Sequence, residues 1–279
     1  MHYFGKYIDT FEMAMQMLFI QKGYGQIKHL DAMGKRCFGF YNGTNGENYY
    51  IPVVEIEAAI NAIARHMNLE NRLTAKHLVG MEAVQACDEG GIVYGPVVEE
   101  SIICQPANMY YHGKNRFFYI RRESENYYTI TDPDGFPGVI YTKKELEHFF
   151  LAERGMTISL YKNDGVHGEE GNIEEIWNEG LSFYTKVVES VERTTAKKES
   201  FNDYIDISSK RIALWYGVMN YIQQIEKVRE LHIQVKNMQT DDRTIRKLQS
   251  DMLKEAEKGK ISALSEIEQT IWKEIVDGI

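Results

Sequence analysis

The fold of this chain is decided by the stretch Arg116-Phe-Phe-Tyr-Ile-Arg-Arg-Glu-Ser-Glu-Asn-Tyr-Tyr-Thr-Ile-Thr-Asp-Pro-Asp-Gly135. Two runs of aromatic and β-branched residues, which are typical of strands, surround a polar stop at 123–126. This pattern predicts a β-hairpin. The second run ends at Asp132-Pro133-Asp134-Gly135, because proline cannot donate to a strand ladder and Asp-Gly favours a tight turn. We therefore expect Asp132 at a strand end where the chain leaves the sheet, a position that often carries a functional site.

The composition indicates a globular protein with a substantial core. The chain has 279 residues, of which 43% are hydrophobic, and its net charge is -9. The negative net charge disfavours nucleic-acid binding, because nucleic acids bind to basic protein surfaces. The sequence contains no apolar run of about 18 residues and no hydrophobic signal region at its start, so we expect neither membrane insertion nor secretion. Three widely spaced cysteines, Cys37, Cys87 and Cys104, favour a reducing compartment, and we expect a cytoplasmic location.

Before the hairpin, the pattern predicts helices and short strands. Asp9 and Glu12 have the spacing of a capping box, and the apolar run 13–20 that follows predicts a central, buried helix. The other predicted elements are a strand over 49–54 limited by Pro52, an amphipathic helix over 55–67, a helix over 74–86 and a glycine-bounded strand over 90–98.

After the hairpin, Thr142 and Glu145 form a second predicted capping box at the start of a helix, and a short strand follows at 157–161. The glycine-rich and acidic segment 163–172 reads as a hinge. Apolar stripes then predict three long helical stretches, at 173–195, 199–236 and 241–278, the last broken near Gly259. We therefore predict an α+β domain over 1–162 and a helical bundle or hairpin over 173–279.

The sequence predicts no metal site and no cofactor. His66 and His77 have no partners at metal-ligand spacing, and the segment 163–172 does not match a calcium loop. Gly90 and Gly91 do not belong to a GxGxxG pattern that opens a helix, which disfavours a dinucleotide.

The order of four stretches resembles a known family, the papain-like acyltransferases typified by the butirosin-biosynthesis protein, which are related to bacteriocin-processing cysteine peptidases. The stretches are Tyr7 to Gly23, Met33 to Tyr41, Gly90 to Val98, and Arg116 to Pro133. The resemblance covers about the first 150 residues. It implies a papain-like antiparallel sheet packed on a central N-terminal helix, with a helical C-terminal region.

The resemblance also implies a chemistry. In this family a cysteine at the start of the first helix is activated by the helix N-terminus. A histidine at the start of the first hairpin strand takes its proton, and an aspartate at the end of the second strand orients the histidine. The thiolate attacks a thioester or amide carbonyl, and the acyl group passes to an amine or to water. Substrates of the acyltransferases are carried on a carrier protein.

Two of the three catalytic positions depart from the family pattern. The cysteine position falls on Ile8, with Asp9 and Thr10 beside it, and none of these is a thiol. The histidine position falls on Arg116, whereas the aspartate position matches Asp132. Cys87 and Cys104 read as small core residues, and Cys37 lies in a glycine-aromatic turn. The chain therefore looks like a member that lacks the catalytic cysteine and histidine.

Alternatives remain at this site. His112, after Tyr111, is either a displaced base that shares a proton with Asp132 or a loop histidine. Asp132 is either an orienting carboxylate or a turn residue, and an ion pair with Arg116 would hold the old site shut. The candidate catalytic residues are therefore His112, Asp132, Asp9 and Thr10, and the candidate binding residues are Ile8, Arg116 and Tyr111.

Three functional hypotheses follow. The first is a degenerate papain-like protein of peptide or secondary-metabolite biosynthesis that binds an acyl or peptidyl carrier, or a small molecule. The second is an active acyl-transferring or amide-forming enzyme with a rebuilt site. The third is a scaffold whose helical tail forms a homodimer. An acidic carrier would dock on basic residues, for which the candidates are Lys35-Arg36, Arg121-Arg122 and Lys197-Lys198, each better explained as ordinary surface charge.

Overall fold

A computed structural model gives the fold. It describes residues 10–27, 30–33, 36–42, 48–54, 56–97, 116–133, 136–165, 171–172 and 242–277, with single positions at 174–176, 178, 179, 215, 218, 219, 222, 225, 226, 229 and 233. The chain divides into two compact units, Met1–Gly34 with Ile56–Gly171, and Lys35–Glu55 with Asn172–Ile279. The predicted domain limits differ from this division at 35–55. The division after Gly171 falls inside the predicted hinge.

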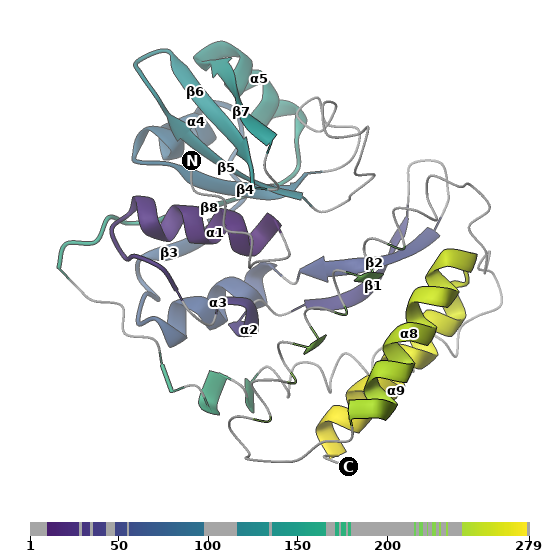
Figure 1. The fold of residues 1–279 in the computed structure, drawn as a ribbon. Helices are drawn as coiled ribbons and strands as arrows, with labels where there is room; N and C mark the ends of the chain where they lie inside the picture. The colour runs from purple at the N-terminus through teal and green to yellow at the C-terminus, as the bar shows by residue number, and fades with distance from the viewer. Residues whose placement is uncertain are drawn as a thin grey trace. The chain divides into compact units, whose positions relative to one another are not determined.

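The first unit contains a six-stranded antiparallel sheet, which gives the chain the α+β class that the sequence predicts (Figure 1). The strand order is β3-β8-β4-β5-β6-β7. The strands are β3 (Leu73–Lys76), β4 (Ile92–Val97), β5 (Arg116–Arg122), β6 (Tyr127–Asp132), β7 (Phe136–Thr142) and β8 (Met156–Leu160).

The predicted hairpin is confirmed as β5 and β6. Tyr119 pairs with Thr131 and Arg122 with Tyr128. The turn is closed by the backbone N–H groups of Glu123 and Ser124, which both donate to the carbonyl of Tyr127. The polar stop between the two runs therefore becomes the tip of the hairpin.

The strand end predicted at Asp132 is confirmed, because β6 ends there, but the expectation that the chain leaves the sheet at this point is wrong. The chain turns back into β7, which pairs with β6 in an antiparallel register that shifts between Ile130 and Asp132. The sequence Phe136-Pro137-Gly138 does not predict a strand, because proline and glycine usually interrupt strands. Proline is tolerated here because β7 lies at the edge of the sheet, beside the register shift.

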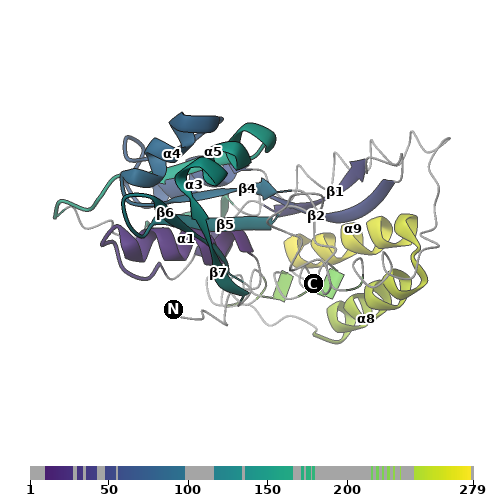
Figure 2. The ribbon, with the colours of Figure 1, turned by 90° about the horizontal axis from the view of Figure 1, so that it is seen from above.

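Helices cover both faces of this sheet. Helix α1 (Thr10–Gln21) packs on β5 and β4, whereas α4 (Gly80–Asp88) and α5 (Lys143–Ala152) pack on the opposite face. Figure 2 shows α4 and α5 on one side of β5 and α1 on the other. The alternation of β5 explains the layers, because successive side chains of a strand point to opposite faces. Phe117 contacts Phe11 of α1, whereas Phe118 joins the core under α4 and α5.

The core under α4 and α5 is centred on Tyr94. Its ring contacts Phe149 and Phe150 of α5 edge to face, with ring centres 5.4 and 5.0 Å apart. Its buried hydroxyl accepts a hydrogen bond of 3.0 Å from the backbone N–H of Gly155. Tyr94 thereby fixes α5 to the turn that leads into β8.

The predicted capping box of α5 is confirmed. The Thr142 hydroxyl accepts from the Glu145 N–H, and the Glu145 carboxylate accepts from the Thr142 N–H at 2.8 Å. The helix predicted over 55–67 is α3 (Ile56–His66). The helix predicted over 74–86 is partly wrong, because residues 73–76 form β3 along β8, and α4 begins only at Gly80. The described part of the first unit also contains the short helix α2 (Leu30–Met33).

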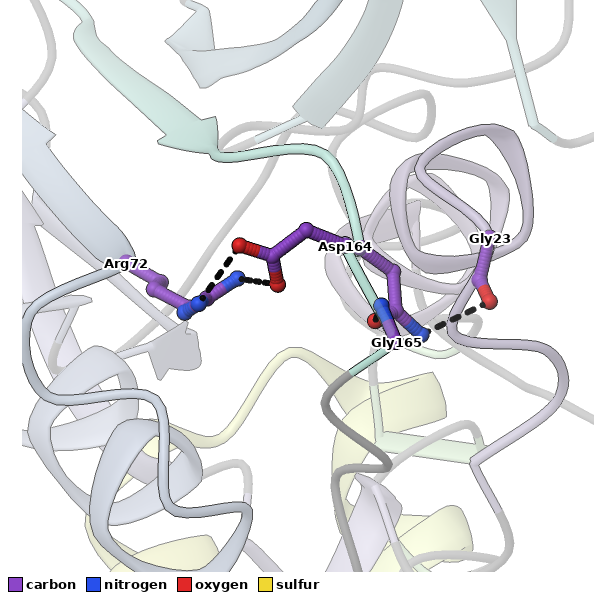
Figure 3. A network of polar contacts seen from close by, with 5 residues as sticks. Gly23, Arg72, Asp164 and Gly165 are labelled. Atoms are coloured by element: carbon purple, nitrogen blue, oxygen red, sulfur yellow. Dashed lines mark hydrogen bonds and ion pairs between the residues drawn. The ribbon is translucent and has the colours of Figure 1, made fainter.

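The described ends of the predicted hinge are attached to the first unit. Arg72 forms a bidentate ion pair with Asp164, with nitrogen–oxygen distances of 2.8 and 3.2 Å (Figure 3). The Asn163 side chain donates to the carbonyl of Gly23, and the Gly171 N–H donates to the carbonyl of His66. Residues 166–170 lie outside the described residues, so the hinge itself stays a prediction.

The elements of the second unit that the structure describes in full are a two-stranded sheet of β1 (Arg36–Asn42) and β2 (Asn48–Val54) and the helices α8 (Asp242–Lys258) and α9 (Ile261–Asp277). The predicted break near Gly259 is confirmed. Helical positions between 215 and 233 agree with the predicted middle stretch. Several residues of the predicted apolar stripes are buried, at Ile225, Met252, Ala256, Leu264, Ile271 and Ile275. No helix in the described part of the chain has the length and apolar character that crossing a bilayer requires.

Candidate functional site

The candidate site lies where the first turn of α1 meets the start of β5. Thr10, the first residue of α1, is 8% exposed, and its Oγ1 accepts a hydrogen bond of 3.0 Å from the backbone N–H of Phe117. The rings of Phe11 and Phe117 meet edge to face, with centres 5.0 Å apart. The start of the first helix is therefore held against the start of β5, next to Arg116.

Asp132 lies at the same end of the hairpin. Its neighbour Thr131 pairs with Tyr119 of β5, and Asp132 itself pairs with Phe136 of β7. Asp132 is 7% exposed, so its carboxyl group is largely removed from water. The structure thus brings two predicted site residues, Thr10 and Asp132, to one end of the β5–β6 pair.

Glu12 is a buried acidic residue near this site, for which the sequence predicted only a role in helix capping. It lies in the first turn of α1, one residue after Phe11, and is fully buried at 0% exposure. A carboxylate is favoured near a helix N-terminus, where the unpaired N–H groups carry partial positive charge. The capping-box spacing predicted its place in the first turn, but no signal in the sequence predicted its burial.

The other predicted residues are not positioned at this junction by the structure. Ile8, Asp9, Tyr111 and His112 lie outside the described residues. Arg116 is described only as backbone, where it pairs with Val97 of β4. The pairing of Tyr119 with Thr131 places Asp132 across from Phe118, two residues from Arg116. The register therefore does not place Arg116 directly opposite Asp132, and the proposed ion pair stays a prediction.

The described thiol is unsuited to nucleophilic chemistry. Cys87 lies on α4, in the core on the opposite face of the sheet from α1, and it is completely buried. Burial, together with the nearby Asp88 carboxylate, raises the pKa of the Cys87 thiol well above its ordinary value. The reactive form of cysteine is the thiolate, so Cys87 is an inert core residue, as the sequence predicts.

A depression of about 420 Å³ lies at the far end of α1, beside the hairpin tip. It is lined by Gln21, Asp88, Gly90, Arg121, Arg122, Glu123, Ser124 and Glu125. Both of its arginines lie near carboxylates of the same depression. Arg121 Nε lies 2.8 Å from Glu123, and Arg122 Nε lies 3.6 Å from Asp88 and donates to the carbonyl of Ser124. This pairing weakens the argument that Arg121 and Arg122 dock an acidic carrier.

Lys22 is a lysine with a structural role beside this depression. Its side chain is almost completely buried, and its Nζ donates to the carbonyl of Glu89 over 3.0 Å. Desolvation lowers the Lys22 pKa, although the nearby Glu89 carboxylate opposes the shift. The bond attaches the end of α1 to the end of α4, which fixes the lengthwise position of α1.

Within the described ranges, no three His, Cys, Asp or Glu side chains lie close enough together to hold a metal ion. Comparison of the chain with protein-family models, with curated proteins and with solved structures finds no match. The family resemblance therefore depends on the sequence pattern alone, and the structure supports its coarse α+β arrangement.

Proposed function

We propose that this chain is a degenerate relative of the papain-like acyltransferases that binds an acyl or peptidyl carrier, or a small acyl-bearing molecule, without cysteine chemistry. Its place would be in peptide or secondary-metabolite biosynthesis. The proposal is supported by the sequence resemblance and by the buried junction of α1 with β5.

One observation carries the proposal. Two residues after Ile8, the position that the resemblance assigns to the family's reactive thiol, this chain has the Thr10 hydroxyl, which accepts a hydrogen bond from the backbone N–H of Phe117. A hydroxyl needs an adjacent base to become a nucleophile, whereas a buried hydroxyl that accepts a backbone N–H holds two elements together. The bond between Thr10 and Phe117 thus favours a junction that maintains the fold and binds, without forming an acyl-enzyme.

Intact-mass spectrometry tests the absence of covalent chemistry. The native protein is incubated with simple acyl thioesters of N-acetylcysteamine, and its mass is compared with that of protein denatured before incubation. We expect no native-specific acyl adduct. A stoichiometric adduct that requires the folded protein, mapped to any residue from 8 to 12, would overturn the proposal.

Binding is measured separately by calorimetry with a phosphopantetheinylated carrier protein, in its acylated and free forms. We expect the acylated carrier to bind more tightly, because the acyl group is the part that the family's site receives. Equal or undetectable binding of both forms would remove the carrier from the proposal.

A second candidate function is an acyl-transferring or amide-forming enzyme with a rebuilt site. The burial of Asp132 at the end of β6 favours it, because a buried carboxylate at a strand end is suited to orient a base. In this enzyme, His112 would act as the base, and Asp9 or Thr10 would supply the nucleophile. Replacing His112 with alanine should then abolish turnover, and an unchanged rate would eliminate His112.

A further inference from the structure

The depression beside the hairpin tip has the size and the lining of a site for a polar small molecule. Its volume of about 420 Å³ falls within the range of ligand pockets in proteins, about 300–1,000 Å³. Apart from Gly90, every described residue that lines it has a polar or charged side chain, so it is unsuited to an acyl chain. It lies at the C-terminal end of α1, whereas Thr10 begins the helix, so a ligand here would not depend on the proposed function.

Both arginines of the depression are held through their Nε atoms. Arg121 Nε donates to the Glu123 carboxylate over 2.8 Å, and Arg122 Nε donates to the Ser124 carbonyl over 2.9 Å. In the part of the chain that the structure describes, no group accepts a hydrogen bond from the Nη nitrogens of either arginine. Their side chains are 44% and 39% exposed. Each guanidinium is thus oriented by the protein and still has donors for a ligand.

Two carboxylates of the depression are already occupied by groups of the protein. Asp88 accepts a hydrogen bond of 2.7 Å from the Tyr128 hydroxyl. Glu123 accepts one of 2.7 Å from the Thr129 hydroxyl, in addition to that from Arg121. The bond from Thr129, and then that from Arg121, hold the pKa of Glu123 below its ordinary value. Glu123 therefore stays ionised at neutral pH and keeps Arg121 in position.

A buried cation lies directly behind the lining of the depression. Lys22 is 5% exposed, and a Cβ atom placed on Gly90 would be 2.9 Å from its Nζ. The absence of a side chain at Gly90 therefore brings the charge of Lys22 close to the depression. An ammonium group has three donors, and within the described residues only one of them is used, by the carbonyl of Glu89. This positive charge favours an anion.

We propose that the depression binds a small, polar carboxylate, a hydroxy acid or an amino acid, whose carboxylate group accepts hydrogen bonds from the Nη nitrogens of Arg121 and Arg122. A planar carboxylate matches the fork of a guanidinium group. A ligand with one negative charge suits the depression better than a phosphate, because three carboxylates also line it. The Ser124 hydroxyl and the Gln21 amide provide partners for the hydroxyl or amino substituents of the ligand.

Ligand-observed NMR titration of the full chain tests the binding. The probes are glycerate and serine, each beside its amide, which lacks the carboxylate, and inorganic phosphate. We expect saturable binding of glycerate or serine and much weaker binding of the amides. Arg121→Gln and Arg122→Gln should each weaken the binding about tenfold or more. Arg154→Gln is the matched control, because Arg154 is exposed and outside the depression, and it should leave the affinity unchanged.

Four results of the titration would overturn the proposal. The first is that neither glycerate nor serine binds saturably. The second is that the amides bind as tightly as the acids, and the third is that phosphate binds more tightly than both acids. The fourth is that Arg154→Gln weakens binding as much as Arg121→Gln, which would indicate a general effect of net charge.

Chemical protection locates the bound carboxylate in the unmodified protein. Phenylglyoxal reacts with accessible guanidinium groups, and peptide mapping gives the rate of modification at each arginine. Saturating glycerate should slow the modification of Arg121 and Arg122 and leave that of Arg154 unchanged. Equal protection of the three arginines, or protection of neither Arg121 nor Arg122, would place the ligand elsewhere and would overturn the proposal.

Discussion

Thr10 and Phe117 are 107 positions apart in the sequence, yet the hydroxyl of one accepts the backbone N–H of the other over 3.0 Å. The bond joins the first residue of α1 to the start of the hairpin that organises the sheet. It is buried, so both groups have given up water to form it. The bond therefore helps to fix the position of α1 on the sheet, together with the packing of Phe11 on Phe117.

Replacing Thr10 with valine should destabilise the protein by about 1–3 kcal/mol, because the near-isosteric side chain leaves the Phe117 N–H buried without an acceptor. Thr10→Ser is the matched control. It keeps the acceptor and loses one methyl group, which costs about 1 kcal/mol or less. Urea unfolding measures both variants. A valine variant as stable as the serine variant would show that the hydroxyl does not hold the junction.

Cys87 should resist thiol reagents in the native protein. Burial disfavours the thiolate and also blocks access, so we expect iodoacetamide to label Cys87 only after unfolding. Peptide mapping after brief labelling at neutral pH, with and without denaturant, separates Cys87 from Cys37 and Cys104. Rapid native labelling of Cys87 would contradict its place in the core and would reopen the possibility of thiol chemistry.

The hairpin could be predicted from sequence because its two runs and its polar stop are local signals. The capping box at Thr142 is equally local. β7 could not be predicted, because Pro137 and Gly138 indicate a turn, and only its place at the sheet edge makes them acceptable. β3 is four residues long, and its pairing with β8, far away in the sequence, decides its structure.

The candidate site was predictable only in part. The family resemblance predicted that the first helix would begin beside the hairpin strands, and the bond between Thr10 and Phe117 agrees with this arrangement. The full burial of Glu12 could not be predicted, because an acid in a first helical turn normally remains in water. Arg116 does not lie opposite Asp132 because of the register in which the strands pair. This register cannot be predicted from the amino-acid composition.

The capping box should make stability depend on acidity. The backbone N–H of Thr142, and then its hydroxyl, hold the pKa of Glu145 below its ordinary value. Because the folded-state pKa is the lower one, the stabilisation is complete above the unfolded-state pKa, near 4.5, and is lost as the pH falls through the folded value. Glu145→Gln should therefore be less stable at neutral pH and lose less stability on acidification.

Urea midpoints between neutral pH and about pH 3 measure this difference. Glu147→Gln is the matched control, since it removes the same charge from the same helix and should keep the slope of the unmodified protein. Identical slopes for Glu145→Gln and the unmodified protein would show that the capping carboxylate does not contribute to the acid response.

We expect both the hydroxyl and the ring of Tyr94 to stabilise the folded protein. The hydroxyl accepts the Gly155 N–H over 3.0 Å in the core, so Tyr94→Phe should leave that N–H buried without an acceptor and cost about 1–3 kcal/mol. The ring contacts with Phe149 and Phe150 remain in this variant, so any loss reports the hydrogen bond. Tyr161→Phe is the control, because Tyr161 is exposed and its change should leave stability unaltered. Urea unfolding compares the two. Equal stability of both variants would mean that Gly155 finds another acceptor and that Tyr94 fixes α5 by ring packing alone.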